Sequence, residues 1–426
     1  MRKLLNYSKK IFQLDGLYIA NVSATFLSQF FSALSVLILT PRLLTALGPN
    51  EFSLYGIILN AIVVGAILDF GMNLGLLRRF ILEKEKSTEL FSSVLVAYVF
   101  IVVIAGALSL LAIGIFPGIA QGLNSLYLLV LIILIFQTIV ANLLDVMIQS
   151  SQKIFKAKLI RLSKVVTEML LILYFLKYGS LIWVLGIMLL LNTLYILALY
   201  LYARKAVDFS FNLKFVKWQT VREHLHYSTW YFLTALSAVL VLNSQVFLLN
   251  KLVGAILLAQ FLVYARFFEI IRLAVSNFTV VLFPAIVSKE SERDGKKLLH
   301  FYFSALGRVF IVLIAIATGL YFIGEPLFNW WMKDKVLFDS TIFFLFLGFT
   351  SLILIDNVSA LFLSALKLNR MPTIVSLVQG VVGLALTWQL GQFGILGALI
   401  ASLVALVFTS LLYNPFYLIK NLRGRA

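Results

Sequence analysis

Long apolar runs, separated by short polar and basic stretches, fill the 426-residue chain. A helix rises about 1.5 Å per residue and a bilayer core is about 30 Å thick, so a run of about 18 apolar residues can cross it. Short segments of alternating polarity, which would indicate barrel strands, do not recur. The pattern predicts an all-α polytopic membrane protein. Its twelve expected spans are 18–41, 53–76, 90–116, 126–149, 161–178, 181–203, 227–250, 255–283, 299–323, 337–366, 371–391 and 395–418.

Basic residues are distributed unevenly between the two sets of loops that these spans define. Of the 35 Lys and Arg residues, 27 fall in one set of loops and 5 in the other. Cytoplasmic loops carry the excess of positive charge in membrane proteins, so this asymmetry predicts cytoplasmic termini. The net charge of +17 is then explained by contact with anionic membrane lipids, and no nucleic-acid partner is expected.

The amino-acid composition excludes several classes of protein. With 62% hydrophobic and 12% charged residues, the chain is not an ordinary soluble domain. It contains no Cys, which excludes thiol catalysis and cysteine metal sites. His224, His226 and His300 lie at inner span edges without ligand-spaced partners, so we expect them at the interface and expect no metal site. Enzyme motifs such as a P-loop or HExxH are absent, and no cofactor beyond a coupling H⁺ or Na⁺ is expected.

The two halves of the chain look related. A shift of 209 aligns residues 42–55 with 251–264, and a shift of 214 aligns 150–156 with 364–370. An even number of spans per half gives parallel repeats, related by an axis along the membrane normal. We therefore expect two six-helix lobes, with an N-terminal lobe at 1–205 and a C-terminal lobe at 227–426. Residues 206–226 interleave aromatic and basic side chains and predict an amphipathic connection on the inner leaflet.

Three charges near the middle of the eighth span organise the functional interpretation. Arg266, Glu269 and Arg272 are spaced i, i+3, i+6, which places them on one flank of a helix. Charge in mid-membrane is costly and by default marks a substrate or ion path. Two interpretations remain open: a closed pair that joins helices, or a positively charged cavity that takes an anion. Under the 209-residue shift the three positions align with Ile57, Asn60 and Val63.

Other acids also fall within spans. Glu168 follows Lys164 by one helical turn, which predicts a structural ion pair. Asp69, Asp145 and Asp356 lie in the inner halves of even-numbered spans. Facing a cavity they would bind H⁺ or Na⁺, and facing a neighbouring helix they would join the two. Both readings stay open, with helix joining favoured for Asp145.

Three short motifs, in order along the chain, carry a family resemblance. The run PRLLTALGPNEFSLYG at 41–56 resembles the first outer loop of the bacterial O-antigen and polysaccharide flippases. Asp69-Phe-Gly, followed by Arg78, resembles the end of their second helix, and GQFGILGAL at 391–399 is similar to their last hairpin. The resemblance covers the whole chain in order and spacing. This family belongs to the multidrug/oligosaccharidyl-lipid/polysaccharide exporter superfamily.

The resemblance implies two six-helix lobes around a cavity in the bacterial cytoplasmic (inner) membrane. It also implies transfer of undecaprenyl-diphosphate-linked oligosaccharide, as in O-antigen or lipopolysaccharide biosynthesis, with polysaccharide assembly enzymes as further partners. Arg266 and Arg272 are then the expected diphosphate ligands, and Arg42 and Arg78 are weaker candidates. Glu269 is the expected holder of the two arginines, and it joins Asp69, Asp356 and Asp145 as candidates for ion coupling. The alternatives are a drug exporter working by cation antiport and, less compatible with the short outer loops, a glycan polymerase.

Overall fold

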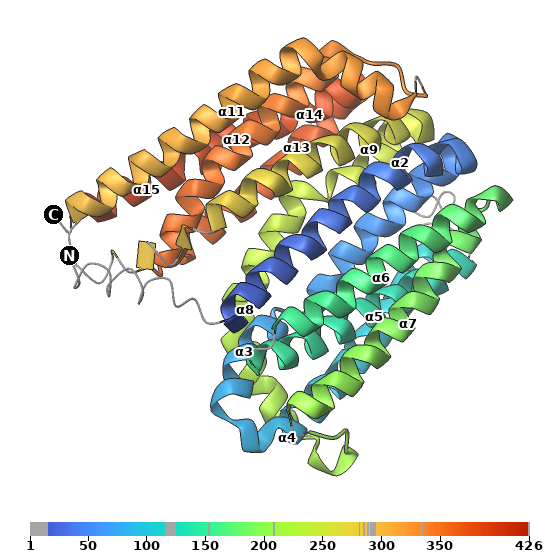
Figure 1. Ribbon diagram of the computed structural model, residues 1–426, viewed down its shortest axis with the longest axis vertical. Coiled ribbons are helices and arrows are strands. Elements are labelled where there is room, and N and C mark those ends of the chain that lie inside the picture. The colour runs from blue at the N-terminus through green and yellow to red at the C-terminus, as the bar shows by residue number, and fades with distance from the viewer. Residues whose placement is uncertain are drawn as a thin grey trace. The chain divides into compact units, whose positions relative to one another are not determined.

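Helices account for nearly all of the described chain (Figure 1). The computed structural model describes residues 16–115, 125–151, 154–207, 209–280, 282–283, 286–287, 289, 295–333 and 335–424. Within these residues there is no strand, which agrees with the predicted all-α architecture. The helices are α2 (Gly16–Gly65), α3 (Met72–Leu82), α4 (Ser87–Ile115), α5 (Ser125–Ser150), α6 (Ile154–Phe175), α7 (Leu181–Ala206), α8 (Trp218–Leu242), α9 (Gln245–Val280), α11 (Gly295–Met332), α12 (Ser340–Ala365), α13 (Arg370–Leu390), α14 (Gly394–Leu406) and α15 (Leu412–Arg423).

Eight helical stretches of the described chain are long and apolar enough to cross a membrane. Three of them, Ser23–Asp69, Ser228–Ser276 and Arg370–Arg423, contain 47, 49 and 54 residues. Each is about twice the 20 residues that one span needs, so each holds two spans. The helix α6 is long enough but too highly charged to be counted among the eight. With α6 included, the layout agrees with the twelve predicted spans and with a multi-pass membrane protein.

The chain forms two compact units. Unit 1 consists of Met1–Leu39 and Leu68–Thr229, and unit 2 consists of Thr40–Ile67 and Trp230–Ala426. Two units agree with the predicted two-lobe architecture, but Thr40–Ile67 groups with unit 2, whereas it was expected in the N-terminal lobe. The helix α8 crosses from one unit to the other between Thr229 and Trp230.

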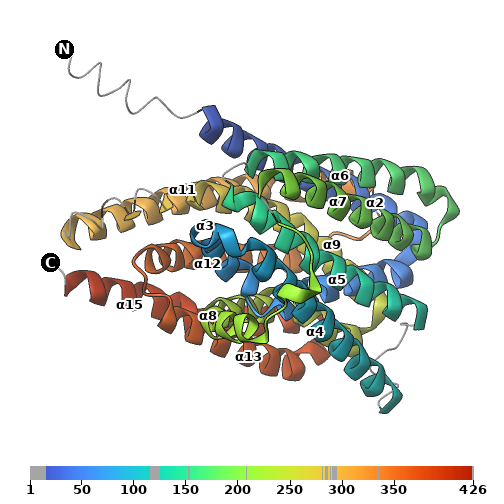
Figure 2. The same ribbon diagram turned by 90° about the horizontal axis from the view of Figure 1, so that it is seen from below.

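In unit 1, α5, α6 and α7 run side by side (Figures 1 and 2). The buried core lies among α3, α4, α5 and α7 and includes Phe80, Tyr98, Leu143 and Leu199. The segment between α7 and α8 packs on the start of α4, where Phe209 is buried against Phe91. The outward side chains of this segment form an exposed apolar row with Phe211, Leu213, Phe215 and Trp218. The second part of the predicted 206–226 connection belongs to α8, and its place on the inner leaflet stays a prediction.

In unit 2, the helices α12, α14 and α9 pack against one another, and α13 packs on α14. The buried core below them includes Tyr302, Leu354, Phe362 and Leu418. A single π-helical turn at Val407–Leu411 joins α14 to α15 and carries the buried Ser410. Such turns bend a helix locally, which here lets one long helical stretch run from Gly394 to Arg423.

Two glycines with almost identical backbone conformations break long helices. Gly48 in α2 has φ 71° and ψ 171°, and Gly254 in α9 has φ 76° and ψ 174°. This region of the Ramachandran map is essentially restricted to glycine. The two positions differ by 206 residues, not by the predicted 209. In the corrected register, Arg266, Glu269 and Arg272 correspond to Asn60, Val63 and Ala66.

Candidate functional site

The helix α9 is anchored by aromatic residues along one face. Tyr264 and Phe268 are fully buried, and their rings stack on Phe328 and Phe346 of the neighbouring helices α11 and α12. The Tyr264 hydroxyl also accepts a hydrogen bond of 2.7 Å from the backbone N–H of Asp339. Because a helix repeats every 3.6 residues, this packing fixes which way its other face points. Arg266 and Glu269 lie on the sides of the helix turned away from Tyr264, whereas Arg272 follows Phe268 by one helical turn and shares its side.

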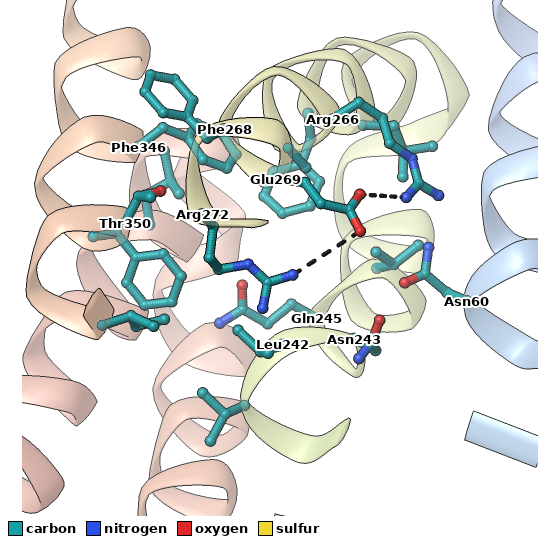
Figure 3. A pocket seen from close by; sticks show the side chains of 18 residues that line it. Asn60, Leu242, Asn243, Gln245, Arg266, Phe268, Glu269, Arg272, Phe346 and Thr350 are labelled. Atoms are coloured by element: carbon teal, nitrogen blue, oxygen red, sulfur yellow. Dashed lines mark hydrogen bonds and ion pairs between the residues drawn. The ribbon is translucent and has the colours of Figure 1, made fainter. Parts of the chain in front are cut away.

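Glu269 lies between two guanidinium groups (Figure 3). Arg266 Nη1 donates to Glu269 Oε2 over 2.6 Å, whereas Arg272 Nη2 lies 4.0 Å from Glu269 Oε1. The first contact is a charge-assisted hydrogen bond, and the second is too long to be one. The side chains of Arg266, Glu269 and Arg272 are 25%, 31% and 29% exposed. The guanidinium group of Arg272 therefore has N–H donors that no described residue accepts.

An open cleft in unit 2, with a cavity volume of about 110 Å³, is lined by all three charged side chains. Its walls come from α2, α8, α9, α12 and α14, and its other polar residues include Asn60, Asn243, Gln245 and Thr350 (Figure 3). The remaining lining is largely aromatic and aliphatic, as is typical of ligand clefts. The cleft combines a net positive charge with polar amide groups, an arrangement that suits an anion attached to a polar head group.

The seventh span is interrupted beside this cleft. The helix α8 ends at Leu242, a turn covers Asn243 and Ser244, and α9 begins at Gln245. The Ser244 hydroxyl donates to the carbonyl of Leu240, and Gln245 Nε2 donates to the hydroxyl of Ser402. In membrane proteins irregular backbone is tolerated where it lines a cavity, as it does here.

The weaker arginine candidates do not lie in this cleft. Arg42 is exposed near the C-terminal end of the first span of α2 and is not among the cleft residues. The backbone of Arg78 belongs to α3 in unit 1, and its side chain lies outside the described part of the structure. Their assignment as diphosphate ligands stays a prediction.

Asp69 marks a break in the second span. The backbone of Phe70 and Gly71 is left-handed, with φ of 50° and 71°. Asp69 accepts hydrogen bonds of 2.8 Å from the Gly71 N–H and 2.9 Å from Asn73 Nδ2 at the start of α3. Asn73 Oδ1 in turn accepts from the Tyr98 hydroxyl over 3.0 Å. These contacts hold the turn before α3 and join it to α4, and the predicted coupling role of Asp69 stays a prediction.

The remaining acids within spans have different environments. Asp145 lies 3.3 Å from Lys158 Nζ, and Glu168 lies 2.6 Å from Lys164 Nζ, so the predicted Lys164–Glu168 pair is present. Asp356 has no ion-pair partner among the described residues. Its Oδ1 accepts a hydrogen bond of 2.8 Å from Asn414 Nδ2. Of the three aspartates, Asp356 has the surroundings most compatible with binding and releasing a cation.

His224 is buried. Only 1% of it is exposed, and its Nε2 lies 3.0 Å from the Met72 carbonyl, to which it donates. Its Nδ1 is buried without a hydrogen-bond partner among the described residues. Burial lowers the pKa of His224 below its ordinary value, because the charged form is desolvated. His224 is thus enclosed within the protein, while His300 is exposed and the side chain of His226 lies outside the described residues; their expected place at the membrane interface stays a prediction.

Sequence reasoning missed several polar residues that line the cleft. Asn243, Gln245 and Thr350 were not expected as site residues, and Asn60 was noted only as a repeat partner. Single amides and hydroxyls are common in transmembrane helices, where they bond to neighbouring helices. The one usable signal was the pair Asn243-Ser244 in the middle of an apolar run, which favours a turn.

Comparisons with known proteins agree with this architecture. Residues 18–290 match the family described as polysaccharide biosynthesis protein. The uncharacterized membrane protein EpsK of Bacillus subtilis (strain 168) is 20% identical over 225 residues, which are 52% of this chain. The match covers 45% of EpsK, less than half of that relative's length.

Two solved structures share the fold at low sequence identity. The lipid II flippase MurJ, in an inward closed conformation, superposes with a TM-score of 0.74 and 17% identity over 96% of this chain and 90% of that chain. A multidrug resistance transporter of the MATE family in an inward-facing conformation gives a TM-score of 0.65 and 16% identity over 95% and 99%. Because the family match spans well over half of the chain, as the sequence motifs indicated, this membrane protein belongs to the polysaccharide biosynthesis protein family.

Proposed function

We propose that the protein is a flippase that moves an undecaprenyl-diphosphate-linked oligosaccharide, such as an O-antigen or polysaccharide repeat unit, to the outer leaflet. The observation that carries the proposal is the Arg266–Glu269–Arg272 cluster, which lines a polar cleft in the interior of a transmembrane unit. The family match and the fold shared with MurJ support the same class of substrate. On this proposal the chain lies in the bacterial cytoplasmic membrane with both termini in the cytoplasm.

The chemistry of the substrate explains the need for such a cleft. A lipid diphosphate carries about two negative charges, and moving ions and unpaired hydroxyls through hydrocarbon costs many kcal/mol. Arginine binds phosphate through two parallel N–H donors and is weakly hydrated, which suits it to a partly desolvated site. Arg272 has unused donors in this structure, and Arg266 can gain them when it leaves Glu269. The polar amides around the cleft match the hydroxyls of a sugar head group.

Alternating access coupled to H⁺ or Na⁺ completes the proposal. Asp356 is the preferred coupling residue because no cation neutralises it among the described residues. Asp69 also has no ion pair among them but is held by two hydrogen bonds at the turn before α3, and Asp145 is paired with Lys158. Glu269 is a further candidate, because its protonation would release Arg266. Anionic lipids and polysaccharide assembly enzymes are the expected partners on the cytoplasmic side.

A drug exporter of the same fold is the rival function, since the MATE transporter shares the architecture. An exporter of organic cations needs a site with net negative charge, and this cleft has two guanidinium groups against one carboxylate. The sign of the cleft therefore favours an anionic substrate.

The experiment compares three proteins in liposomes that contain a fluorescent undecaprenyl-diphosphate-linked sugar. Wild type should expose the sugar to an external lectin, and Arg266→Ala/Arg272→Ala should lose this activity. Arg308→Ala is the matched control, because Arg308 is also in a span but bonds to Ser304 of its own helix over 3.2 and 3.0 Å. Equal activity in wild type and the double variant would contradict the proposed site. Transport of a cationic dye without transport of the lipid would favour the exporter.

A further inference from the structure

The helix α6 in unit 1 carries more charge than an ordinary transmembrane helix. Its 22 residues include Lys156, Lys158, Arg161, Lys164 and Glu168. Charges at membrane depth are costly unless they are paired or face water. The proposed function uses none of these residues, so their surroundings call for a separate explanation.

Four of the five charges lie on the packed face of the helix. Arg161, Lys164 and Glu168 are spaced i, i+3, i+7, which places them on one face together with Ala157 and Ile172, the two buried side chains of α6. The opposite face carries exposed Leu170 and Tyr174, as a lipid-facing surface would. Lys158, Lys164 and Glu168 are therefore held by protein contacts rather than by snorkelling towards the lipid head groups.

Two ion pairs flank Arg161. One turn before it, Lys158 Nζ lies 3.3 Å from Asp145 of α5, and one turn after it, Lys164 Nζ lies 2.6 Å from Glu168. Both pairs are mostly buried, with side-chain exposures of 17–21%. Arg161 itself forms no ion pair with any described residue, and yet it is exposed. Arg161 is thus an exposed cation beside two mostly buried ion pairs.

Groups from each neighbouring helix fit a phosphorylated sugar. On α7, the hydroxyl of Tyr195 lies within electrostatic range of both Arg161 and Asp145. On α5, Asp145 Oδ1 is buried and has no hydrogen-bond donor among the described residues. A guanidinium and a phenol suit phosphate oxygens, and a free carboxylate oxygen suits a sugar hydroxyl. With three cations against two carboxylates, the cluster is net positive, as is the cluster on α9.

We propose that Arg161, held by the Lys158–Asp145 and Lys164–Glu168 pairs, is the core of a second anion site, at which the diphosphate head group is loaded from the cytoplasmic side. This inference rests on the proposed function and on the predicted orientation, in which Ile154 is the cytoplasmic end of α6. Arg161 then lies about 10 Å into the span, at 1.5 Å per residue. The α9 cluster holds the diphosphate deeper in the membrane.

The test measures the concentration dependence of transport in the liposome assay, with a fluorescent undecaprenyl-diphosphate-linked sugar as the probe. Arg161→Ala should raise the half-saturating lipid concentration about tenfold, the loss expected for one charge-assisted contact, and leave the maximal rate nearly unchanged. The half-saturating concentration of Arg161→Lys should lie between those of wild type and Arg161→Ala, because the ammonium group of lysine is a point charge and lacks the planar pair of donors of arginine. Lys156→Ala is the matched control, because Lys156 is an exposed cation near the end of the same helix, on its other face.

The outcomes separate the two proposals. If wild type binds undecaprenyl diphosphate no better than undecaprenol, the proposed function fails, and the loading site loses its ligand with it. If wild type transports the lipid and Arg161→Ala has the same half-saturating concentration as Lys156→Ala, only the loading site is overturned. Arg161 then only interacts with anionic lipids of the inner leaflet. If Arg161→Ala does not fold, Arg161→Gln in the same assay decides, and a wild-type concentration dependence again overturns the site.

Discussion

Neutralising Glu269 gives the sharpest prediction, because the two readings of the α9 cluster expect opposite results. If Glu269 restrains two anion-binding arginines, Glu269→Gln should strengthen the binding of a diphosphate lipid. If the cluster only joins helices, the same change removes a stabilising pair and weakens binding or folding. Glutamine preserves the size of the side chain, so the change is one of charge.

The distances set the expected magnitude. At an effective dielectric constant of about 20, a separation of 2.6 Å corresponds to about 6 kcal/mol of attraction and one of 4.0 Å to about 4 kcal/mol. Arg266 is therefore the more strongly restrained guanidinium, by up to about 2 kcal/mol. Freeing it adds one charge-assisted contact of about 1.5 kcal/mol to a bound anion, which is about tenfold in affinity. If release limits the rate, turnover should fall by a similar factor.

The assay is titration of undecaprenyl diphosphate onto purified protein in neutral-lipid nanodiscs, with undecaprenol as the uncharged reference. Arg272→Ala should bind weakly, because the remaining Arg266 stays paired with Glu269. Adding Glu269→Gln to Arg272→Ala should restore binding close to the wild-type level, since one free guanidinium is again present. Glu89→Gln is the control, because it removes an ion pair of 2.7 Å with Lys217 far along the sequence.

Weaker binding by Glu269→Gln, together with no recovery in the Glu269→Gln/Arg272→Ala protein, would refute the restraint. It would assign Glu269 to helix packing and leave Arg272 without a defined ligand. If Glu89→Gln lost as much binding as Glu269→Gln, the assay would be responding to the loss of any ion pair.

Three further predictions address coupling, pH and backbone. Asp356→Asn keeps the contact with Asn414 and should flatten the response of transport to a pH or Na⁺ gradient; an unchanged response would assign Asp356 to packing. Burial lowers the pKa of His224, so its stabilising contribution is complete above the ordinary value of 6.5 and is lost as the pH falls towards the lowered pKa. The thermal midpoint of wild type should therefore drop more between about pH 7.5 and pH 5.5 than that of His224→Gln, and parallel curves would exclude this role. Gly254→Ala should destabilise unit 2 by about 1–3 kcal/mol in thermal unfolding, because an alanine is strained at a φ of +76°. No atom lies within 4 Å of the new methyl group at either position, so Gly307→Ala within α11, which lacks the positive φ, should not destabilise the unit.

Much of the fold followed from the apolar pattern, because a membrane allows few structures for an apolar segment. Within the described residues the predicted spans fall largely on helix, with breaks at Phe70-Gly71 and Asn243-Ser244, and the cluster of Arg266, Glu269 and Arg272 lines a cleft. Mid-membrane charge is so costly that three such residues in one span carry a strong signal even in a single sequence. On α6, Lys156, Lys158, Arg161 and Lys164 lie near a helix end, where interfacial charge is ordinary, so they carry a weaker signal in the sequence.

Other features depended on contacts that no local pattern encodes. The break at Asp69 requires Phe70 to adopt a left-handed backbone, which is unusual for a bulky residue and could not be expected from its type. The burial of His224 depends on how α8 packs against α3. The unequal distances from Glu269 to its two arginines follow from the side-chain conformations that their shared cleft permits.

The error in repeat register has a physical origin and leads to a result of its own. Shifts of 209 and 206 differ by three residues, close to one helical turn, so both superpose apolar faces almost equally well. Only a position with a backbone that glycine alone tolerates fixes the register, and Gly48 and Gly254 supply it. In that register Asn60 corresponds to Arg266, and both line the same cleft. At this pair of positions the first half presents an amide and the second half a guanidinium to one cleft. On the proposed function, this difference gives the cleft the positive charge that an anionic head group needs.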